Sequence, residues 1–280
     1  MTELVVRRLL VDMQAPLDRH WCGGDAFKTA FFNALSMSFP VGEQFFMDSV
    51  RRGFKALPAE KQGPLAAEIQ GFVGQEATHR RLHSLFNAHL SRHGLVNAWE
   101  PKALKRLAPL AEADPRHGVA ITAANEHFTA IFADWLLAHP EVLADSEERL
   151  KSLWLWHCAE EAEHKSTAFD VYRALDGSEA WRKTWFRRVT LIFLADTLSQ
   201  TVDNLRRDGS LWRWRTWVSG ARFLLGRHGL ITETFSAWRQ YLRTGFHPND
   251  LPSPLSQAWL THNRDRYTPV GAPRHDPTTS

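Results

Sequence analysis

Two Glu-x-x-His motifs lie 85 residues apart in this chain, and a lone glutamate precedes each motif. An α-helix turns by about 100° per residue, so a glutamate and a histidine three residues apart point along one stripe and can bind one metal ion. Four helices that offer Glu, Glu-x-x-His, Glu and Glu-x-x-His to a common axis form the ligand pattern of di-iron and di-manganese carboxylate sites. The spacing therefore predicts a two-metal site. The first set is Glu43, Glu76 and His79, and the second is Glu126, Glu161 and His164.

The distances along the chain support this prediction. In an antiparallel helix hairpin, residues equidistant from the connecting loop lie level with each other. Glu43 and Glu76 lie 17 and 16 residues from Glu60, at the centre of the first expected loop. Glu126 and Glu161 lie 17 and 18 residues from the centre of the second loop. At about 1.5 Å per residue, each pair is level to within about 2 Å. A buried group of four carboxylates would be very unfavourable without cations, so the pattern indicates bound metal.

The helix that carries the second motif holds further candidates. His157 lies four residues before Glu161 on the same arc of the helix, so it could be a third imidazole ligand. The alternative is a partly buried histidine among tryptophans. Glu160 could replace Glu161 as a ligand, although it fits the mirrored spacing less well. We expect Glu163 to face solvent.

Helical periodicity predicts the elements that must position these residues. We expect an all-α fold with no sheet, in which Pro40 kinks the first helix one turn before Glu43. The expected helices span 25–56, 64–93, 99–139 with an interruption near 114–115, 146–175, 182–207, 211–225 and 229–243. The expected divisions are an N-terminal extension (1–24), a four-helix bundle (25–177), a basic, tryptophan-rich helical appendage (178–246) and an extended tail (247–280).

Composition points to an ordinary globular protein. The 280 residues are 44% hydrophobic and 23% charged. Cys22 and Cys158 form no disulfide framework, and no secretory cleavage pattern begins the chain. No apolar run reaches the roughly 18 residues of a spanning helix. We therefore expect a cytoplasmic location.

The C-terminal third has a different character. Residues 181–243 contain 12 Lys and Arg against 4 Asp and Glu, although the net charge of the whole chain is only +3. Six of the 12 tryptophans lie in the same segment. This composition suits peripheral contact with a membrane surface, which would extend the expected location to a membrane-peripheral one. It would also suit packing on the bundle or a homodimer interface, and we expect no nucleic-acid binding.

Over roughly residues 25–175 the ligand pattern resembles the ferritin-like di-iron carboxylate superfamily. The segment Trp156–Lys165, followed by Ala168–Tyr172, resembles a bacterial family labelled predicted metal-dependent hydrolase. The ligand order is also similar to that of p-aminobenzoate N-oxygenase, a di-iron enzyme that oxidises an arylamine with dioxygen, and His157 matches the additional histidine of its fourth helix. The resemblance implies a ferritin-like antiparallel four-helix bundle with additional C-terminal helices. It implies metal ligation by Glu43, Glu76, His79, Glu126, His157, Glu161 and His164.

These observations favour a di-iron oxygenase or oxidase that uses dioxygen on a small organic or lipid-like substrate, by N- or C-oxygenation or desaturation. Two iron ions are the expected cofactor, with manganese as the other candidate, because the donors are carboxylates and imidazoles. The electrons would come from an external donor, since the chain contains no flavin or iron–sulfur motif. The alternatives are a di-metal hydrolase and a non-catalytic metal-binding protein. Four aromatic residues near the ligands could wall an apolar pocket or be ordinary core: Phe45, Phe46, Phe128 and Phe132.

Overall fold

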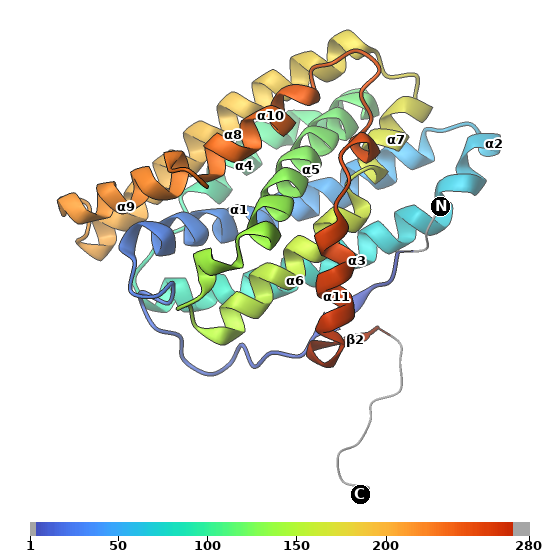
Figure 1. The fold of residues 1–280 in the computed structure, drawn as a ribbon. Helices are drawn as coiled ribbons and strands as arrows, with labels where there is room; N and C mark the ends of the chain where they lie inside the picture. Colours follow the sequence, from blue (N-terminus) through green and yellow to red (C-terminus); the bar gives the residue numbers. More distant parts are fainter. Residues whose placement is uncertain (1–3, 271–280) are drawn as a thin grey trace, which may run out of the picture.

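The computed structural model describes residues 4–270 and is 74% helical with one small two-stranded sheet, so the all-α prediction is confirmed (Figure 1). None of the helices in this range is long and apolar enough to cross a bilayer. The helices are α1 (Ala26–Lys55), α2 (Ala59–Gln62), α3 (Ala66–Arg92), α4 (Trp99–Leu107), α5 (Pro115–Ala138), α6 (Glu148–His164), α7 (Thr167–Ala174), α8 (Glu179–Asp208), α9 (Trp214–Leu225), α10 (Leu230–Gln240) and α11 (Pro254–His262).

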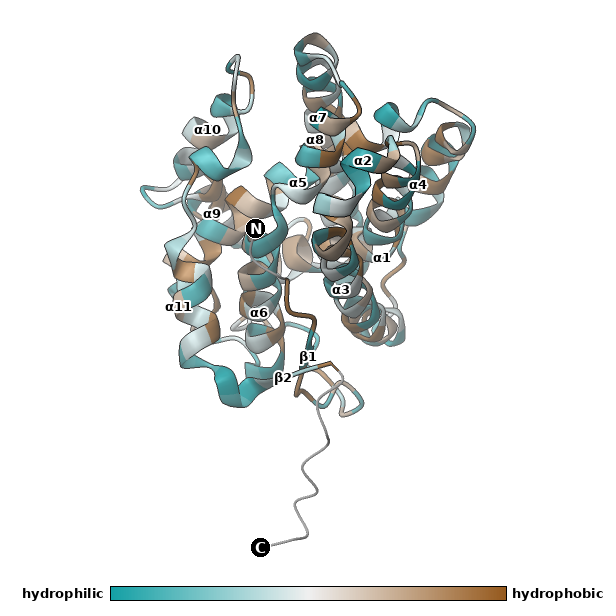
Figure 2. Cartoon of the chain, turned by 90° about the vertical axis from the view of Figure 1, so that its right-hand side faces the viewer, coloured by the Kyte–Doolittle hydropathy of each residue, from teal (hydrophilic) through white to brown (hydrophobic). Residues whose placement is uncertain are grey.

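Four long helices, α1, α3, α5 and α6, form the centre of the molecule. Helix α1 packs against α3 and α5, and α5 packs against α6. Helix α8 lies on α1 and α5, whereas α10 lies on α5 and α11 on α6. Figure 2 shows α9, α10 and α11 on one side of the molecule and α4 on the other. The buried aromatic side chains that fill the centre include Phe32, Phe72, Trp154 and Trp156.

Helix α1 continues through Pro40, and the kink expected there stays a prediction. Proline has no N–H, so the carbonyl of Ser36, four residues earlier, lacks its helical donor. Asn87 of α3 replaces that donor, because its Nδ2 lies 2.9 Å from the Ser36 oxygen. The neighbouring helix thus satisfies the carbonyl that Pro40 leaves free.

The expected fourth helix, 146–175, is in fact two helices. Helix α6 ends at His164, and α7 begins at Thr167. The Lys165 side chain at the break extends to the segment before α11, where its Nζ bonds the Leu251 carbonyl and lies 2.7 Å from Ser253 Oγ. The helical periodicity continues through the break, so the sequence carried no stop signal.

Two expectations about the ends of the chain were wrong. We expected no sheet, but β1 (Arg7–Leu9) pairs antiparallel with β2 (Tyr267–Pro269). We expected an extended tail from residue 247, but α11 forms there and packs on α6 and α5. The prolines of this segment wrongly indicated extended chain, because Pro254 occupies a position in the first helical turn that proline favours. The remaining part of the predicted tail, residues 271–280, lies outside the described residues.

Candidate metal centre

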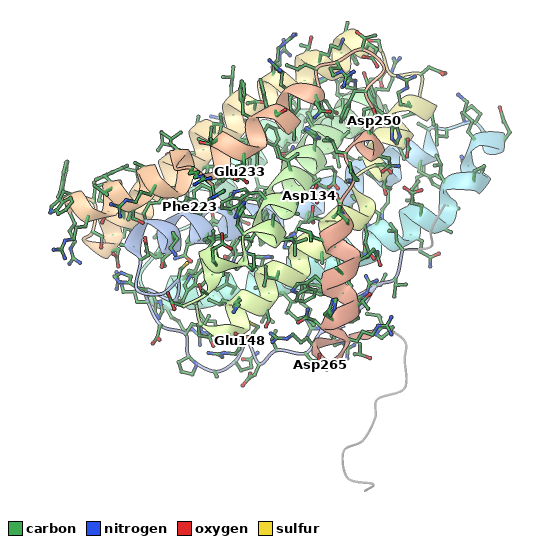
Figure 3. The ribbon with its side chains drawn as sticks, viewed as in Figure 1. Asp134, Glu148, Phe223, Glu233, Asp250 and Asp265 are labelled. Atoms are coloured by element: carbon green, nitrogen blue, oxygen red, sulfur yellow. The ribbon has the colours of Figure 1, made fainter. Side chains whose placement is uncertain are left out.

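The structure brings the seven predicted ligands together between α1, α3, α5 and α6. Each of their side chains is buried, with at most 4% of the residue exposed. Other carboxylates behave differently: Glu148, Asp250 and Asp265 project from the outside of the fold (Figure 3). The cluster consists of Glu43, Glu76, His79, Glu126, His157, Glu161 and His164.

Two groups within this cluster have the spacing of metal ligands. Glu76, His79, Glu161 and His164 each place one N or O atom within 4.8 Å of the others, and Glu43, His79 and His157 do the same. His164 Nε2 lies 3.5 Å from Glu76 Oε1 and 3.7 Å from Glu161 Oε1. The two groups share His79.

Glu126 joins the first group through a histidine. His164 Nδ1 lies 3.0 Å from Glu126 Oε2. The second lone glutamate therefore contacts the Glu-x-x-His motif of α6, as the spacing predicted.

Many donor and acceptor atoms of the cluster have no hydrogen-bond partner among residues 4–270. Buried polar atoms are normally paired, and leaving one unpaired costs about 1–3 kcal/mol. The concentration of such atoms at one place fits the donor set of divalent cations. The unpaired atoms are both carboxylate oxygens of Glu43 and of Glu76, Glu126 Oε1, Glu161 Oε2, His79 Nδ1 and His164 Nε2.

The electrostatics also indicate cations. Burial raises the pKa of Glu43 and of Glu76 well above the usual range, and for Glu76 the neighbouring carboxylates Glu161 and Glu126 raise it further. Burial likewise raises the pKa of Glu126 to about 7. Burial acts against ionisation of Glu161 too, but the nearby imidazoles of His164, His157 and His79 hold its pKa well below the usual range. Without added positive charge, these carboxyl groups do not all ionise together.

Glu160 is not in either ligand group. Its Oε2 lies 3.0 Å from His79 Nε2, and its Oε1 accepts a 3.0 Å hydrogen bond from Arg7 Nη1. His79 therefore presents Nδ1 to the cluster while Nε2 is held by Glu160. Burial opposes protonation of His79, but its hydrogen bond to Glu160 and the Glu161 carboxylate, whose Oε1 lies 3.2 Å from Nδ1, raise its pKa to about 10.

Glu163, which we expected to face solvent, is largely buried. Its carboxylate accepts hydrogen bonds from Arg7 (2.6 Å), Gln75 (2.9 Å) and Gln257 (2.9 Å). Arg7 comes from β1, and its guanidinium also lies 5.5 Å from the centre of the Tyr267 ring of β2. Glu160 and Glu163 thus bind the N-terminal strand beside the cluster.

His83 is a second residue that sequence reasoning missed. Its Nε2 lies 2.8 Å from His157 Nδ1, and its Nδ1 lies 2.9 Å from Ser36 Oγ. Burial lowers the pKa of His157 to about 4 and that of His83 below its usual range, so both imidazoles are neutral. His83 lies four residues after His79 on the same face of α3. This spacing could have identified His83 as a neighbour of the metal cluster.

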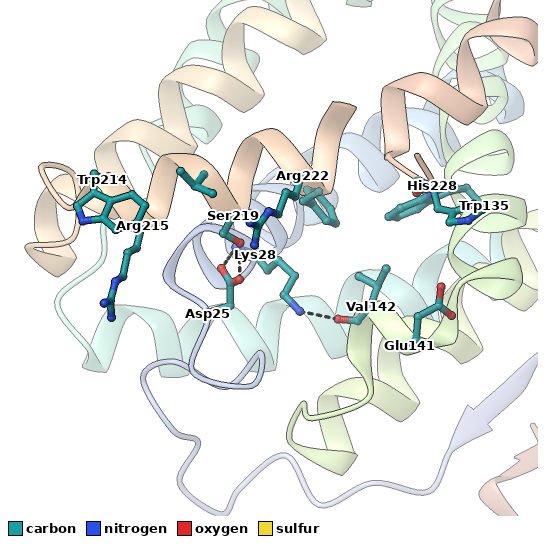
Figure 4. A pocket seen from close by; sticks show the side chains of 12 residues that line it. Asp25, Lys28, Trp135, Glu141, Val142, Trp214, Arg215, Ser219, Arg222 and His228 are labelled. Atoms are coloured by element: carbon teal, nitrogen blue, oxygen red, sulfur yellow. Dashed lines mark hydrogen bonds between the residues drawn. The ribbon is translucent and has the colours of Figure 1, made fainter. Parts of the chain in front are cut away.

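Of the two alternatives for the four aromatic residues, the structure supports ordinary core packing. Phe128 stacks between Phe186 and Phe193, with ring centres 5.3 and 5.4 Å away, and Phe132 packs against Trp154. Phe46 is buried in the core, and Phe45 is partly buried against it. A cavity of about 650 Å³ opens elsewhere, between α9 and the start of α1 (Figure 4), and none of the seven cluster residues lines it.

Comparison with known proteins identifies the family. The sequence model of a family described as "Predicted metal-dependent hydrolase" matches residues 5–251. No curated protein and no solved structure matches the chain significantly, so membership of the ferritin-like superfamily stays a prediction. The match covers most of the 280 residues and includes the whole buried cluster. The chain therefore belongs to the predicted metal-dependent hydrolase family.

Proposed function

We propose that this chain is a hydrolase that binds two divalent metal ions in the buried cluster and acts on a small organic substrate. The observation that carries this proposal is the set of buried, unpaired carboxylate and imidazole atoms that converge from four helices. The family description supports hydrolysis in preference to oxygenation.

The two ligand groups divide the cluster between the two ions. Glu43, His79 and His157 would hold one ion, and Glu76, Glu161 and His164 the other. Glu126, beside His164, completes the second group. When bound, such a pair of ions supplies a hydroxide nucleophile at neutral pH and polarises the bond to be cleaved.

The surrounding residues fix the orientation of the histidines. Glu160 accepts a hydrogen bond from His79 Nε2, which leaves Nδ1 as the free nitrogen. His83 fixes His157 in the same way at Nδ1. Hydrogen bonds of this kind hold a ligand in the tautomer and ring orientation that metal binding needs.

Aromatic rings keep the centre dry. The Trp156 ring lies edge-on to His79 and the Phe72 ring edge-on to His164, each with ring centres 5.0 Å apart. Both aromatic side chains are fully buried. Exclusion of water strengthens every electrostatic interaction inside the site.

The test measures metal content and hydrolysis together. The purified chain should bind two equivalents of divalent metal by elemental analysis and should turn over members of an ester, amide and phosphoester library. The double variant Glu76→Gln, Glu161→Gln should lose both properties. Glu148→Gln, on the exposed face of α6, is the matched control and should keep both. Unchanged metal binding in the double variant would refute the proposal.

A second candidate is dioxygen-dependent oxidation at a di-iron centre, supplied by an external electron donor. The observation that favours it is the donor set, because four carboxylates and three imidazoles without a thiolate suit iron. Removal of dioxygen separates the two functions. Turnover that continues anaerobically supports the hydrolase, and turnover that requires both dioxygen and a reductant supports the oxidase.

A further inference from the structure

Helix α8 carries an exposed stripe of leucines. Leu191, Leu194 and Leu198 are 71%, 52% and 59% exposed. They are spaced by three and four residues, so they lie along one face of the helix. Exposed leucines occur singly on most proteins, but a continuous apolar patch marks an interaction site.

Helix α10 extends this apolar patch. It lies directly beside α8, since Trp238 Nε1 donates to Thr190 Oγ1 at 3.2 Å and the Trp238 ring centre is 5.6 Å from that of Phe186. Phe235 stacks on Trp238, with ring centres 5.7 Å apart, and is itself exposed. Ile231, four residues before Phe235, is also exposed. These exposed apolar residues of α10 therefore lie next to Trp238, the residue through which α10 contacts α8.

Helix α9 adds aromatic and cationic groups. Trp214 is 69% exposed, and Val218 and Leu225 follow it along the helix, both exposed. Trp214, Val218, Arg215 and Arg222 line the cavity of about 650 Å³ together with Lys28 of α1 (Figure 4). We define the α8–α10 surface by the exposed apolar residues of these three helices together with Arg215 and Arg222 of α9. The apolar residues are Leu191, Leu194, Leu198, Trp214, Val218, Leu225, Ile231 and Phe235.

The positive charge of this segment is largely uncompensated. All four carboxylates of residues 181–243 are already paired: Asp196 with Arg106, Asp203 with Arg206 and Arg207, Asp208 with Arg19 and His20, and Glu233 with His139 and His228. Within the described part of the chain, no carboxylate lies within ion-pair distance of eight of the twelve basic residues. These eight are Arg187, Arg188, Arg213, Arg215, Arg222, Arg227, Arg239 and Arg243.

We propose that the α8–α10 surface docks the chain on an anionic lipid membrane. An apolar face bordered by unpaired arginines and tryptophan is the composition that inserts at the lipid headgroup level. A second copy of the chain fits less well, because a symmetric contact would bring the same unpaired arginines face to face. A nucleic acid would neutralise the arginines but leave the leucines in water.

The test is co-sedimentation of the intact chain with vesicles of phosphatidylcholine alone and of phosphatidylcholine with phosphatidylserine. Binding should require phosphatidylserine and weaken with added salt. The variant Arg215→Gln, Arg222→Gln should bind about 25-fold more weakly, since each arginine near such a surface strengthens binding about fivefold. Leu194→Gln, Leu198→Gln tests the apolar part and should also reduce binding strongly.

The matched control is Arg206→Gln, Arg207→Gln, which removes the same charge from α8 but at residues already paired with Asp203. Its vesicle binding should stay within about twofold of that of the parent chain. If these two arginines contributed as much as Arg215 and Arg222, binding would instead fall by the same 25-fold. All substituted side chains lie at the surface, so circular dichroism should show unchanged helicity in every variant. Absence of binding to phosphatidylserine vesicles overturns the proposal. A concentration-dependent dimer that Leu194→Gln, Leu198→Gln dissociates also overturns it, because the surface would then bind a second copy.

Discussion

Two adjacent glutamates on α6 have different roles. A one-residue step turns the helix by about 100°, so Glu161 faces the cluster while Glu160 reaches His79 from outside and pairs with Arg7. The sequence predicted the metal cluster because the Glu-x-x-His spacing lies within single helices. It did not predict the role of Arg7, which is 153 residues from Glu160, and no local pattern reports such a contact.

Replacing Glu160 tests its positioning role. We expect Glu160→Gln to lower metal affinity by about 10–100-fold, because the amide holds the His79 ring less firmly and no longer favours the ligating tautomer. Calorimetric titration with a divalent metal measures this change in affinity. Glu163→Gln is the matched control, because Glu163 binds Arg7 but touches none of the seven cluster residues. Equal effects of the two substitutions would show that only the Arg7 pairing matters.

Replacing Glu76 should separate stability from function. Burial and the neighbouring Glu161 and Glu126 raise the pKa of Glu76, so in the metal-free protein ionisation of this carboxyl group is unfavourable and lowers the stability of the fold. We expect Glu76→Gln to make the metal-free protein more stable by about 1–3 kcal/mol while weakening metal binding. Urea unfolding with a chelator present measures the first effect. A less stable metal-free variant would contradict this account.

At the scale of elements, close contact between the N-terminal segment and α3 positions Arg7. Gly71 and Gly74 lie three residues apart on α3, and a Cβ atom at either would fall 2.5 Å from Leu4 Cβ or 2.3 Å from Val6 Cγ2. The two glycines therefore allow the segment that carries Arg7 to lie directly against the helix. Arg7 then reaches Glu160 and Glu163.

Gly74→Ala should move this segment outward. We expect a loss of about 1–3 kcal/mol in stability, from the clash with Val6, and weaker metal binding because Arg7 shifts. Gly63→Ala is the matched control. Gly63 has φ −51° and nothing within 4 Å of an added Cβ, so that change should be neutral or stabilising by about 0.4–1 kcal/mol. Thermal unfolding and metal titration of both variants check the prediction.

Most helices could be predicted from periodicity, because long amphipathic segments and their flanking Gly and Pro residues are local signals. Helix α5, for example, begins at Pro115 after the expected interruption, with Asp114 as its N-cap. The break between α6 and α7 could not be predicted, since it accompanies contacts of Lys165 with a segment about 86 residues later. The pairing of β1 with β2 joins the two ends of the described chain and has no local pattern either.

For the whole molecule, metal binding and proton binding compete. In the metal-free protein the pKa of Glu126 is raised to about 7, mainly by burial, and that of His79 to about 10 by its carboxylate partners. Both groups must lose their protons to bind metal, so metal affinity should fall as the pH is lowered below about 10, where His79 takes up a proton, and more steeply below about 7, where Glu126 does so too. Metal affinity should fall about tenfold per pH unit for each proton that the metal displaces. Calorimetry in buffers of different ionisation enthalpy counts the protons released, and a pH-independent affinity would contradict the prediction.

Metal should also stabilise the whole fold, because the ions bind the four central helices together. At a free concentration 100 times the dissociation constant, binding to the folded state alone adds about 2.7 kcal/mol per site. Thermal unfolding with and without a chelator measures the gain. The Glu76→Gln, Glu161→Gln protein should show no such difference.

The contact between β1 and β2 has a consequence for biosynthesis. All seven cluster residues lie before residue 165, so a growing polypeptide holds every metal-binding group before residues 267–269 are made. The strand that bears Arg7, however, finds its partner only when residues 267–269 emerge. A nascent chain would thus have its cation-binding groups early and would receive the outer support of His79 only after about 100 further residues had been made.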